Sequence, residues 1–158
     1  MENTIKKFIE TQKWQYQVLR DQPDQKVYKL GFTLNNGRVD IFVDIRIEPM
    51  LVLIFTVCPV QIPQNHRSRV SELITRANSG LILGNFELDF DDGTLRYKSS
   101  YIYDDTFPEQ EEVFGRNLYV NFDAMDKLLP GVMSVIYANV IPAQAYQQLL
   151  ALQDPSVN

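Results

Sequence analysis

The stretch RVDIFVDIRIEPMLVLIFTVC (residues 38–58) decides the fold class, because two different hydrophobic patterns follow one another in it. In residues 38–48, branched apolar residues alternate with mainly charged ones, which predicts a strand with one apolar and one polar face. In residues 51–58, the odd-numbered and the even-numbered positions are both apolar, which is typical of a strand covered on both faces. Helices can cover one face of this second strand, and the C-terminal helices of the same chain could cover the other.

Further strands are predicted on both sides of this stretch. Residues 14–19 and 28–34 alternate between apolar and polar side chains, and Asn36-Gly37 favours a tight type I′ hairpin turn after the second of them. Residues 86–90 and 95–103 alternate in the same way around an Asp-Asp-Gly turn. The chain therefore contains at least two predicted hairpins.

Helical spacing of apolar residues alternates with these strands along the chain. It predicts helices over residues 4–13, 65–80, 114–140 and 142–150, and Pro130-Gly131 must kink or restart the third of them. This order predicts an α+β fold, in which an antiparallel sheet has helices packed on it.

Length and composition favour one domain. The 158 residues are 45% hydrophobic and 22% charged, an ordinary globular composition that permits a sizeable core. We expect a single domain over residues 1–153 and a frayed C-terminal tail over residues 154–158. The single Cys58 and single His66 exclude an intramolecular disulfide and the common multi-histidine zinc sites.

Charge and targeting signals narrow the partners. The net charge of −5 disfavours general nucleic-acid binding, which depends on excess Lys and Arg. The longest apolar run, residues 50–58, is too short to span a bilayer, and the N-terminus does not resemble a secretory signal. We therefore expect a cytoplasmic protein without a nucleic-acid or membrane partner.

No group of residues has the pattern of an active site, a metal site or a cofactor site. Asp40 and Asp44 share a parity, but Arg38 and Arg46 flank them, which favours a neutralised outer surface over a general acid/base pair. His66 has no adjacent nucleophile. We expect no catalytic, cofactor-binding or metal-binding residues, and a chain that is not an enzyme. A hydrolase that uses Asp40 and Asp44, or His66, is the remoter alternative.

Two further motifs fail on inspection. The acidic turn at residues 89–92 lacks the ligand spacing of a calcium-binding loop, and the glycines Gly80 and Gly84 lack the pattern of a phosphate-binding loop. The sequence pattern instead indicates that Gly80 ends a helix and that Gly84 begins a strand. Cys58 lies in the most apolar strand, where a thiolate is poorly solvated, so we expect an inert core thiol.

An aromatic set supplies the only candidate binding residues. Tyrosine and phenylalanine are favoured at protein interfaces because they offer a large amphipathic surface. The predicted partner-binding residues are Phe42, Tyr97, Tyr101 and Tyr103. Core packing under the C-terminal helices is the alternative role for the same side chains.

One stretch carries a family resemblance. LITRANSGLILGNFELDFDDGTLRY (73–97), followed by MDKLLP (125–130) and VIY (135–137), resembles the YbjN family of bacterial proteins described as sensory transduction regulators. The shared pattern is a helix ending in Asn, a Gly-Xaa-Phe strand, an Asp-Gly turn and a basic-aromatic return strand. The resemblance extends over about residues 65–140, and these motif residues serve the architecture, so the family name implies no active site.

The resemblance also implies a topology and a mode of action. The family resembles the type III secretion chaperone-like fold, with the order α-β-β-β-α-β-β-α and here with extended C-terminal helices. Proteins of that fold commonly form homodimers and hold extended peptides, which implies a homodimer that binds an unknown protein or peptide. A non-enzymatic protein-binding or chaperone-like module is therefore the expected function. The alternative is a small-ligand sensor, with a pocket where Pro130-Gly131 breaks the helix.

Overall fold

Six antiparallel strands form one sheet in the computed structural model, which describes residues 2–104 and 110–153. The order of the strands across the sheet is β1-β2-β3-β4-β6-β5. Every strand pairs with its neighbours in the antiparallel sense. The bounds are β1 Tyr16–Asp21, β2 Gln25–Thr33, β3 Arg38–Arg46, β4 Leu51–Val57, β5 Asn85–Leu88 and β6 Leu95–Ile102. The expected α+β fold with an antiparallel sheet is thus confirmed.

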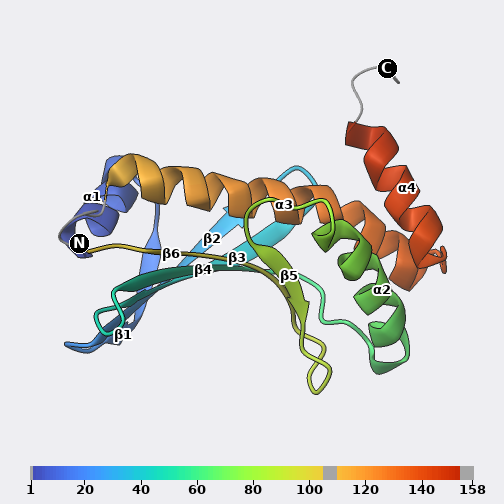
Figure 1. Cartoon of the computed structure of the whole chain (residues 1–158), viewed down its shortest axis with the longest axis horizontal. Helices are drawn as coiled ribbons and strands as arrows, with labels where there is room; N and C mark the ends of the chain where they lie inside the picture. The colour runs from blue at the N-terminus through green and yellow to red at the C-terminus, as the bar shows by residue number, and fades with distance from the viewer. Residues whose placement is uncertain (1, 105–109, 154–158) are drawn as a thin grey trace.

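The helices gather on one side of this sheet (Figure 1). Their bounds are α1 Glu2–Thr11, the 3₁₀ turn η1 Gln64–His66, α2 Arg67–Asn78, α3 Glu111–Tyr137 and α4 Pro142–Gln153. In Figure 1, α3 crosses the sheet from above, α1 lies at one end of it, and α2 lies beside β5. Helix α4 packs on α2 and α3. Among the helices of residues 2–104 and 110–153, none combines the length and apolar character needed to cross a bilayer.

The helices and the sheet enclose the core between them. Register places alternate residues of each strand on the face toward the helices, which we call the inner face, and on the central strands β3 and β4 these side chains are buried. On β3 they are Val39, Ile41, Val43 and Ile45. The opposite side, which we call the outer face, is not covered by any helix of the described residues (Figure 1). The expectation that the C-terminal helices cover the second face of β4 is therefore wrong: α3 contacts β4 and β6 on the inner face, and α4 packs on helices.

The strand count before α2 differs by one from the order that the resemblance implies. Four strands precede α2, because the alternating residues around Tyr16 form β1 at the edge of the sheet. This edge strand is mainly exposed and shifts its register between Val18 and Arg20.

Helix α3 continues through Pro130-Gly131, so the restart expected there as one alternative does not occur. It runs from Glu111 to Tyr137 with Pro130 inside it. A helical proline removes one backbone hydrogen bond, and tertiary packing can compensate for that loss. Gly131 lies against α4: a Cβ atom at this position would be 2.6 Å from Leu149 Cδ1, so no pocket opens there.

The family-like motif residues hold α2 to the β5–β6 hairpin. The Asn78 side chain at the end of α2 donates to the Phe86 carbonyl at 3.0 Å and accepts from the Phe86 amide at 2.8 Å. Gly84 precedes β5 with φ +68°, and Gly93 turns the hairpin with φ +82°. These are conformations that only glycine adopts without strain. The motif thus serves the architecture, as expected.

Candidate functional site

The four aromatic residues predicted to bind a partner do not lie on one surface. Phe42 lies half-buried on the outer face of β3. Tyr97 and Tyr101 lie on the inner parity of β6, where Tyr97 is fully buried and Tyr101 is half-buried. Tyr103 is buried after β6 and donates a hydrogen bond to the Arg46 carbonyl at 2.8 Å. Two tyrosines therefore have the alternative role of core packing, and the partner-binding role of all four stays a prediction.

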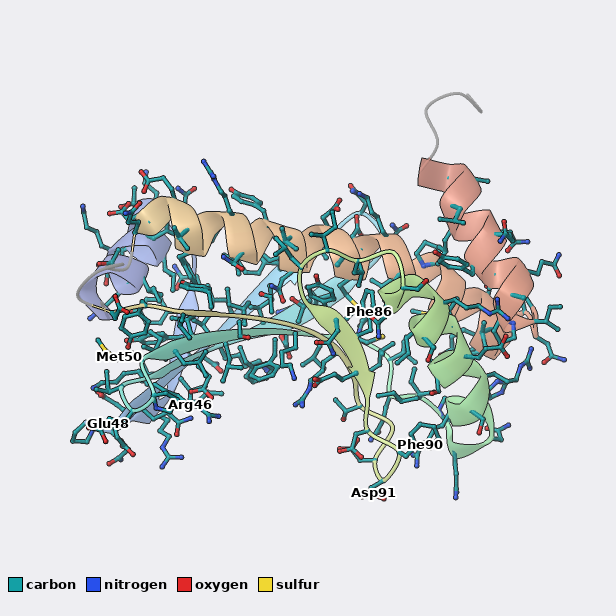
Figure 2. The ribbon with its side chains drawn as sticks, viewed as in Figure 1. Arg46, Glu48, Met50, Phe86, Phe90 and Asp91 are labelled. Atoms are coloured by element: carbon teal, nitrogen blue, oxygen red, sulfur yellow. The ribbon has the colours of Figure 1, made fainter. Side chains whose placement is uncertain are left out.

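A concave site lies on the helix side, at the end of the sheet where β5 and β6 meet the helices. We call it the apolar groove. It has a volume of about 570 Å³, within the range of small-molecule sites. Its walls are the loop that follows α2, the inner face of β5 and β6, the middle of α3, and α4. Figure 2 shows Phe86 pointing from β5 into the space between sheet and helices. The apolar side chains of its wall include Leu81, Leu83, Phe86, Ala124, Leu128 and Leu149.

Apolar side chains also stand exposed at the rim of the groove. Ile82 is 97% exposed and Leu83 is 56% exposed, in a loop bounded by two glycines. Tyr119 from α3 and Leu150 from α4 are also exposed. Exposed apolar clusters around a concavity are typical of binding sites, whereas single exposed apolar residues are ordinary.

Specific contacts hold the walls in place. The Tyr97 hydroxyl donates to the Leu83 carbonyl, which ties the exposed loop to β6. Arg69 on α2 donates to the carbonyls of Asn139 at 3.0 Å and Val140 at 2.9 Å, which ties α2 to the start of α4. The groove is thus formed by the chain itself, without a partner.

Two ionisable side chains of opposite charge lie in the groove wall. Lys127 Nζ and Asp123 Oδ2 are 2.7 Å apart, one helical turn from each other on α3. Burial raises the pKa of the Tyr97 hydroxyl, and the negative charge of Asp123 raises it further, so Tyr97 stays a neutral hydrogen-bond donor near neutral pH. Asp123 and Lys127 therefore balance each other's charge, and Tyr97 adds no charge to the groove.

The outer face is a second candidate surface. Its centre is a row of half-buried apolar side chains, which we call the outer stripe. The outer stripe consists of Phe42 on β3 and Leu51, Leu53, Phe55 and Val57 on β4. Phe42 and Phe55 lie directly opposite each other across the two strands. Residues 51–57 thus carry apolar side chains on both faces, but the expected cover on both faces is not met by the helices of the described residues, which leave the outer face without a helical cover.

Charged side chains flank the outer stripe on both sides. Figure 2 shows Arg46 projecting from the side of the sheet away from α3. The Arg96 guanidinium lies 4.8 Å from the Phe55 ring centre, and Lys29 Nζ lies 5.6 Å from that of Phe42. The strands contribute six basic and three acidic side chains to this face: Arg20, Lys29, Arg38, Arg46, Arg96 and Lys98, against Asp40, Asp44 and Glu87. The outer face is thus net positive on a chain whose net charge is −5.

The acidic residues of this face are engaged in ion pairs. Glu87 pairs with Arg96 at 2.8 Å and also with Lys98. Partial burial raises the pKa of the Glu87 carboxyl, but the hydrogen bonds and charge of Lys98 and Arg96 outweigh it and lower the pKa overall. The basic residues still outnumber their partners, so the positive potential is not cancelled.

The carboxylates considered for catalysis are also neutralised by cations. Asp40 and Asp44 share the outer face, as expected. Lys29 pairs with Asp40 at 2.8 Å, in the place expected for Arg38, and Arg46 pairs with Asp44 at 3.0 Å. Each carboxylate therefore has its own cation, which is the arrangement of a neutralised surface and not of a general acid/base pair.

His66 and the acidic turn have structural positions. His66 ends η1, and its Nδ1 is buried without a hydrogen-bond partner among the described residues. In the turn, Asp89 Oδ1 accepts from the Asp91 amide at 2.8 Å, and Asp92 Oδ1 accepts from the Thr94 amide at 2.6 Å. The Thr94 hydrogen bonds lower the pKa of Asp92. Within the described parts of the chain, no three His, Cys, Asp or Glu side chains gather as metal ligands would.

Cys58 is buried directly after β4, which confirms the expected core position. Burial raises the pKa of its thiol from 9.0 to about 11. Only the thiolate reacts with disulfide reagents, so the native thiol is expected to react with dithiobisnitrobenzoate at least about a hundredfold more slowly than the urea-unfolded chain near neutral pH. Equal reaction rates in buffer and in urea would contradict a buried position for the thiol.

The raised pKa of Cys58 also links stability to pH. Folding raises this pKa, so its contribution to the free energy of unfolding is present below about pH 9 and is lost as the pH rises toward 11.

Sequence reasoning missed the apolar groove. It identified Gly80 and Gly84 correctly as a helix terminator and a strand-entry residue. The signal that could have revealed the site is the run of three large apolar residues, 81–83, between these glycines. A loop of this length has no face of its own to bury three large apolar side chains, so an exposed apolar cluster is expected there.

Comparison with known proteins gives the family of the chain. The YbjN family model, described as "Putative bacterial sensory transduction regulator", matches residues 3–118. A search of curated proteins finds no match. The matched range includes the whole sheet and ends within α3, so it contains the outer face but only part of the groove wall. Because the match extends over well over half of the chain, the chain belongs to the YbjN family.

Proposed function

We propose that this YbjN-family chain is a non-enzymatic regulatory module that binds another protein through the outer face of its sheet. The observation that carries the proposal is the outer stripe, an apolar row along β3 and β4 that no described helix covers. An antiparallel sheet can expose one face to water, but the side chains on such a face are normally polar or charged. Here β4 presents only apolar side chains on that face, and Phe42 of β3 lies beside them, which favours a protein contact.

The charge of the outer face points to an acidic partner. Six basic side chains against three acidic ones would attract a segment that carries Glu or Asp beside apolar residues. Arg96 and Lys29 lie over the two phenylalanines, and their long stems can move aside while their charges stay near a bound carboxylate. An extended acidic and apolar peptide segment of another protein is therefore the proposed partner.

The same charge argues against self-association through this face. Two copies that met face to face would each bring an excess of basic side chains, and like charges in contact are unfavourable. The predicted homodimer stays a prediction. If it forms, we expect it to use another surface and to leave the outer face free.

Absence of catalysis is part of the proposal. Its support is the pairing of Asp40 with Lys29 and of Asp44 with Arg46, together with the buried, high-pKa Cys58. None of these groups has the arrangement of a general base or an activated nucleophile.

A matched pair of variants tests the outer face. Arg96 and Arg76 have equally exposed side chains, and each forms an ion pair with a glutamate. Arg96 pairs with Glu87 on the outer face, and Arg76 pairs with Glu72 on α2. We expect Arg96→Gln to weaken binding of a short fluorescein-labelled peptide of alternating Glu and Leu by about fivefold, because the loss of one charge contact at a surface is worth up to about 1 kcal/mol. Arg76→Gln should leave binding unchanged. Fluorescence anisotropy gives both dissociation constants.

The probes also separate the possible partners. Binding should weaken with salt, and a peptide of alternating Lys and Leu should not bind. The proposal fails if neither peptide binds, if the Lys peptide binds equally well, or if single-stranded RNA binds and displaces the acidic peptide. In the last case the positive stripe with its two phenylalanines would be a nucleic-acid surface.

A small-ligand sensor is a second candidate function. The apolar groove favours it, because this is a cavity of ligand size whose walls are held in place by the chain itself. It lies along α3 before Pro130, not at the predicted break in the helix.

A further inference from the structure

The apolar groove has the depth and size of a small-molecule site. Four parts of the chain converge on it, and its volume of about 570 Å³ suits a drug-sized molecule. Its lining is mainly apolar or aromatic, and includes Phe86 and Tyr97 from the sheet, Tyr119 from α3 and Tyr146 from α4. A molecule bound here would gain most of its affinity from burial of apolar surface.

The loop over the groove is unusual because it exposes apolar side chains although the chain itself fixes its backbone. Ile82 is almost fully exposed, yet the carbonyl of its neighbour Leu83 accepts the Tyr97 hydroxyl. Gly84 permits this close approach: a Cβ atom there would lie 2.6 Å from both the Lys98 carbonyl oxygen and the Tyr97 hydroxyl oxygen. A rim held in this way keeps the groove open in the free protein, so a ligand would not have to order the loop.

The charges of the groove decide which ligands fit. Asp123 and Lys127 pair with each other at 2.7 Å. Both side chains are about half exposed, so the pair stays solvated at the edge of the groove. A charged ligand group buried among the apolar walls would lose its own hydration and find no free counter-charge. A neutral ligand leaves the pair intact.

We propose that the apolar groove binds a neutral, mainly apolar small molecule between the loop 80–84, β6, α3 and α4. The assignment rests on the second candidate function and specifies its ligand class. It does not involve the outer face, so the peptide experiment and the ligand experiment can fail independently of each other.

A pair of fluorescent probes tests both the site and the charge class. N-phenyl-1-naphthylamine is neutral, and 8-anilino-1-naphthalenesulfonate has the same ring system with an added sulfonate. The fluorescence of the neutral probe should rise with saturation at one molecule per chain. The sulfonated probe should bind at least about tenfold more weakly, as expected for a charge brought into a site with no free counter-charge.

A matched pair of variants locates the bound probe. Ala124 lines the groove on α3, whereas Ala151 is exposed on α4 and does not line it. Ala124→Phe should fill the cavity and weaken the neutral probe by at least about tenfold, while Ala151→Phe adds the same side chain outside the cavity and should leave binding unchanged. Thermal unfolding checks that both variants are folded. If Ala124→Phe is not, Tyr119→Ala at the exposed rim replaces it, with an expected loss of about threefold.

Three results would overturn the assignment. The first is the absence of saturable binding of the neutral probe to the wild-type chain. The second is equal or tighter binding of the sulfonated probe, which would show that the site prefers anions. The third is equal binding by the wild-type chain and the folded groove variant, which would place the probe elsewhere on the molecule.

Discussion

Gly93→Ala is expected to lower the free energy of unfolding by about 2–4 kcal/mol, because it strains the backbone and creates a steric clash together. Gly93 has φ +82°, a conformation that side chains with a Cβ atom adopt only with strain. A Cβ atom here would also lie 2.2 Å from the Ile62 carbonyl oxygen. The close approach has a structural cause, since the Ile62 amide donates to the Gly93 carbonyl at 2.8 Å. The substitution must therefore separate the β5–β6 hairpin from the segment that precedes α2.

Urea unfolding of Gly93→Ala measures this loss, and Gly80→Ala is the matched control. A Cβ atom on Gly80 would meet its nearest neighbours at 3.7 and 3.8 Å, which are ordinary contact distances. The control should therefore change the free energy of unfolding by no more than about 0.5 kcal/mol. Equal effects of the two substitutions would show that the left-handed turn and its contact with Ile62 do not matter for stability.

Asn121→Ala should have the second largest effect, a loss of about 2–4 kcal/mol, because it removes a buried amide and its hydrogen bonds together. Asn121 is fully buried on the sheet side of α3. Its amide donates to Ser99 Oγ at 2.6 Å and to the Asn117 carbonyl at 2.9 Å. Thr56 Oγ1 lies 3.5 Å from its carbonyl oxygen. Alanine leaves a cavity and two hydroxyl groups without this partner in the interior.

The control for this prediction is Asn117→Ala, one helical turn earlier. Asn117 is half-buried, and its side chain donates to the Val113 carbonyl of its own helix at 2.9 Å. Its backbone carbonyl, which accepts from Asn121, is kept in the variant. Chemical unfolding should therefore show a change of less than about 1 kcal/mol for Asn117→Ala. A similarly small loss for Asn121→Ala would contradict a stabilising role for the buried amide.

Much of the fold follows from hydrophobic period alone. The alternation of residues 38–48 and the doubly apolar run after Pro49 predict β3 and β4, and both strands form. The helical stripe of α2 and the hairpin around the Asp-Asp-Gly turn also form as predicted. Local patterns are sufficient here because each element buries the residues that its own period selects.

Other features depend on long-range packing, which the spacing of hydrophobic residues along the sequence does not reveal. The apolar stripe of α3 turns Asn121 inward and leaves Phe122 half-buried, the reverse of what polarity predicts. Pro130 stays inside the helix, with Gly131 against Leu149 of α4. The choice of the sheet face that the helices cover could not be made from the sequence, because both faces of β4 are apolar.

The candidate sites show the same division. The pairing of Asp44 with Arg46 can be predicted from the sequence, because residues two apart on one strand lie on the same face. The pairing of Asp40 with Lys29 joins two strands and requires knowledge of which strands are neighbours. The alternation of residues 38–48 places Phe42 on the polar face of its strand, which is the outer face of the sheet. The sequence could not show that the three tyrosines predicted with it lie on the other side of the sheet or beyond its end.

The end of the family match within α3 has an evolutionary consequence. A relative that kept only the matched region would retain every strand, including the positively charged face, but would lose Tyr119, Asp123, Lys127 and the whole of α4 from the cavity wall. The two surfaces can therefore diverge separately: substitutions in the C-terminal quarter of the chain, beyond residue 118, would change the proposed small-molecule site and leave the proposed protein-binding face intact.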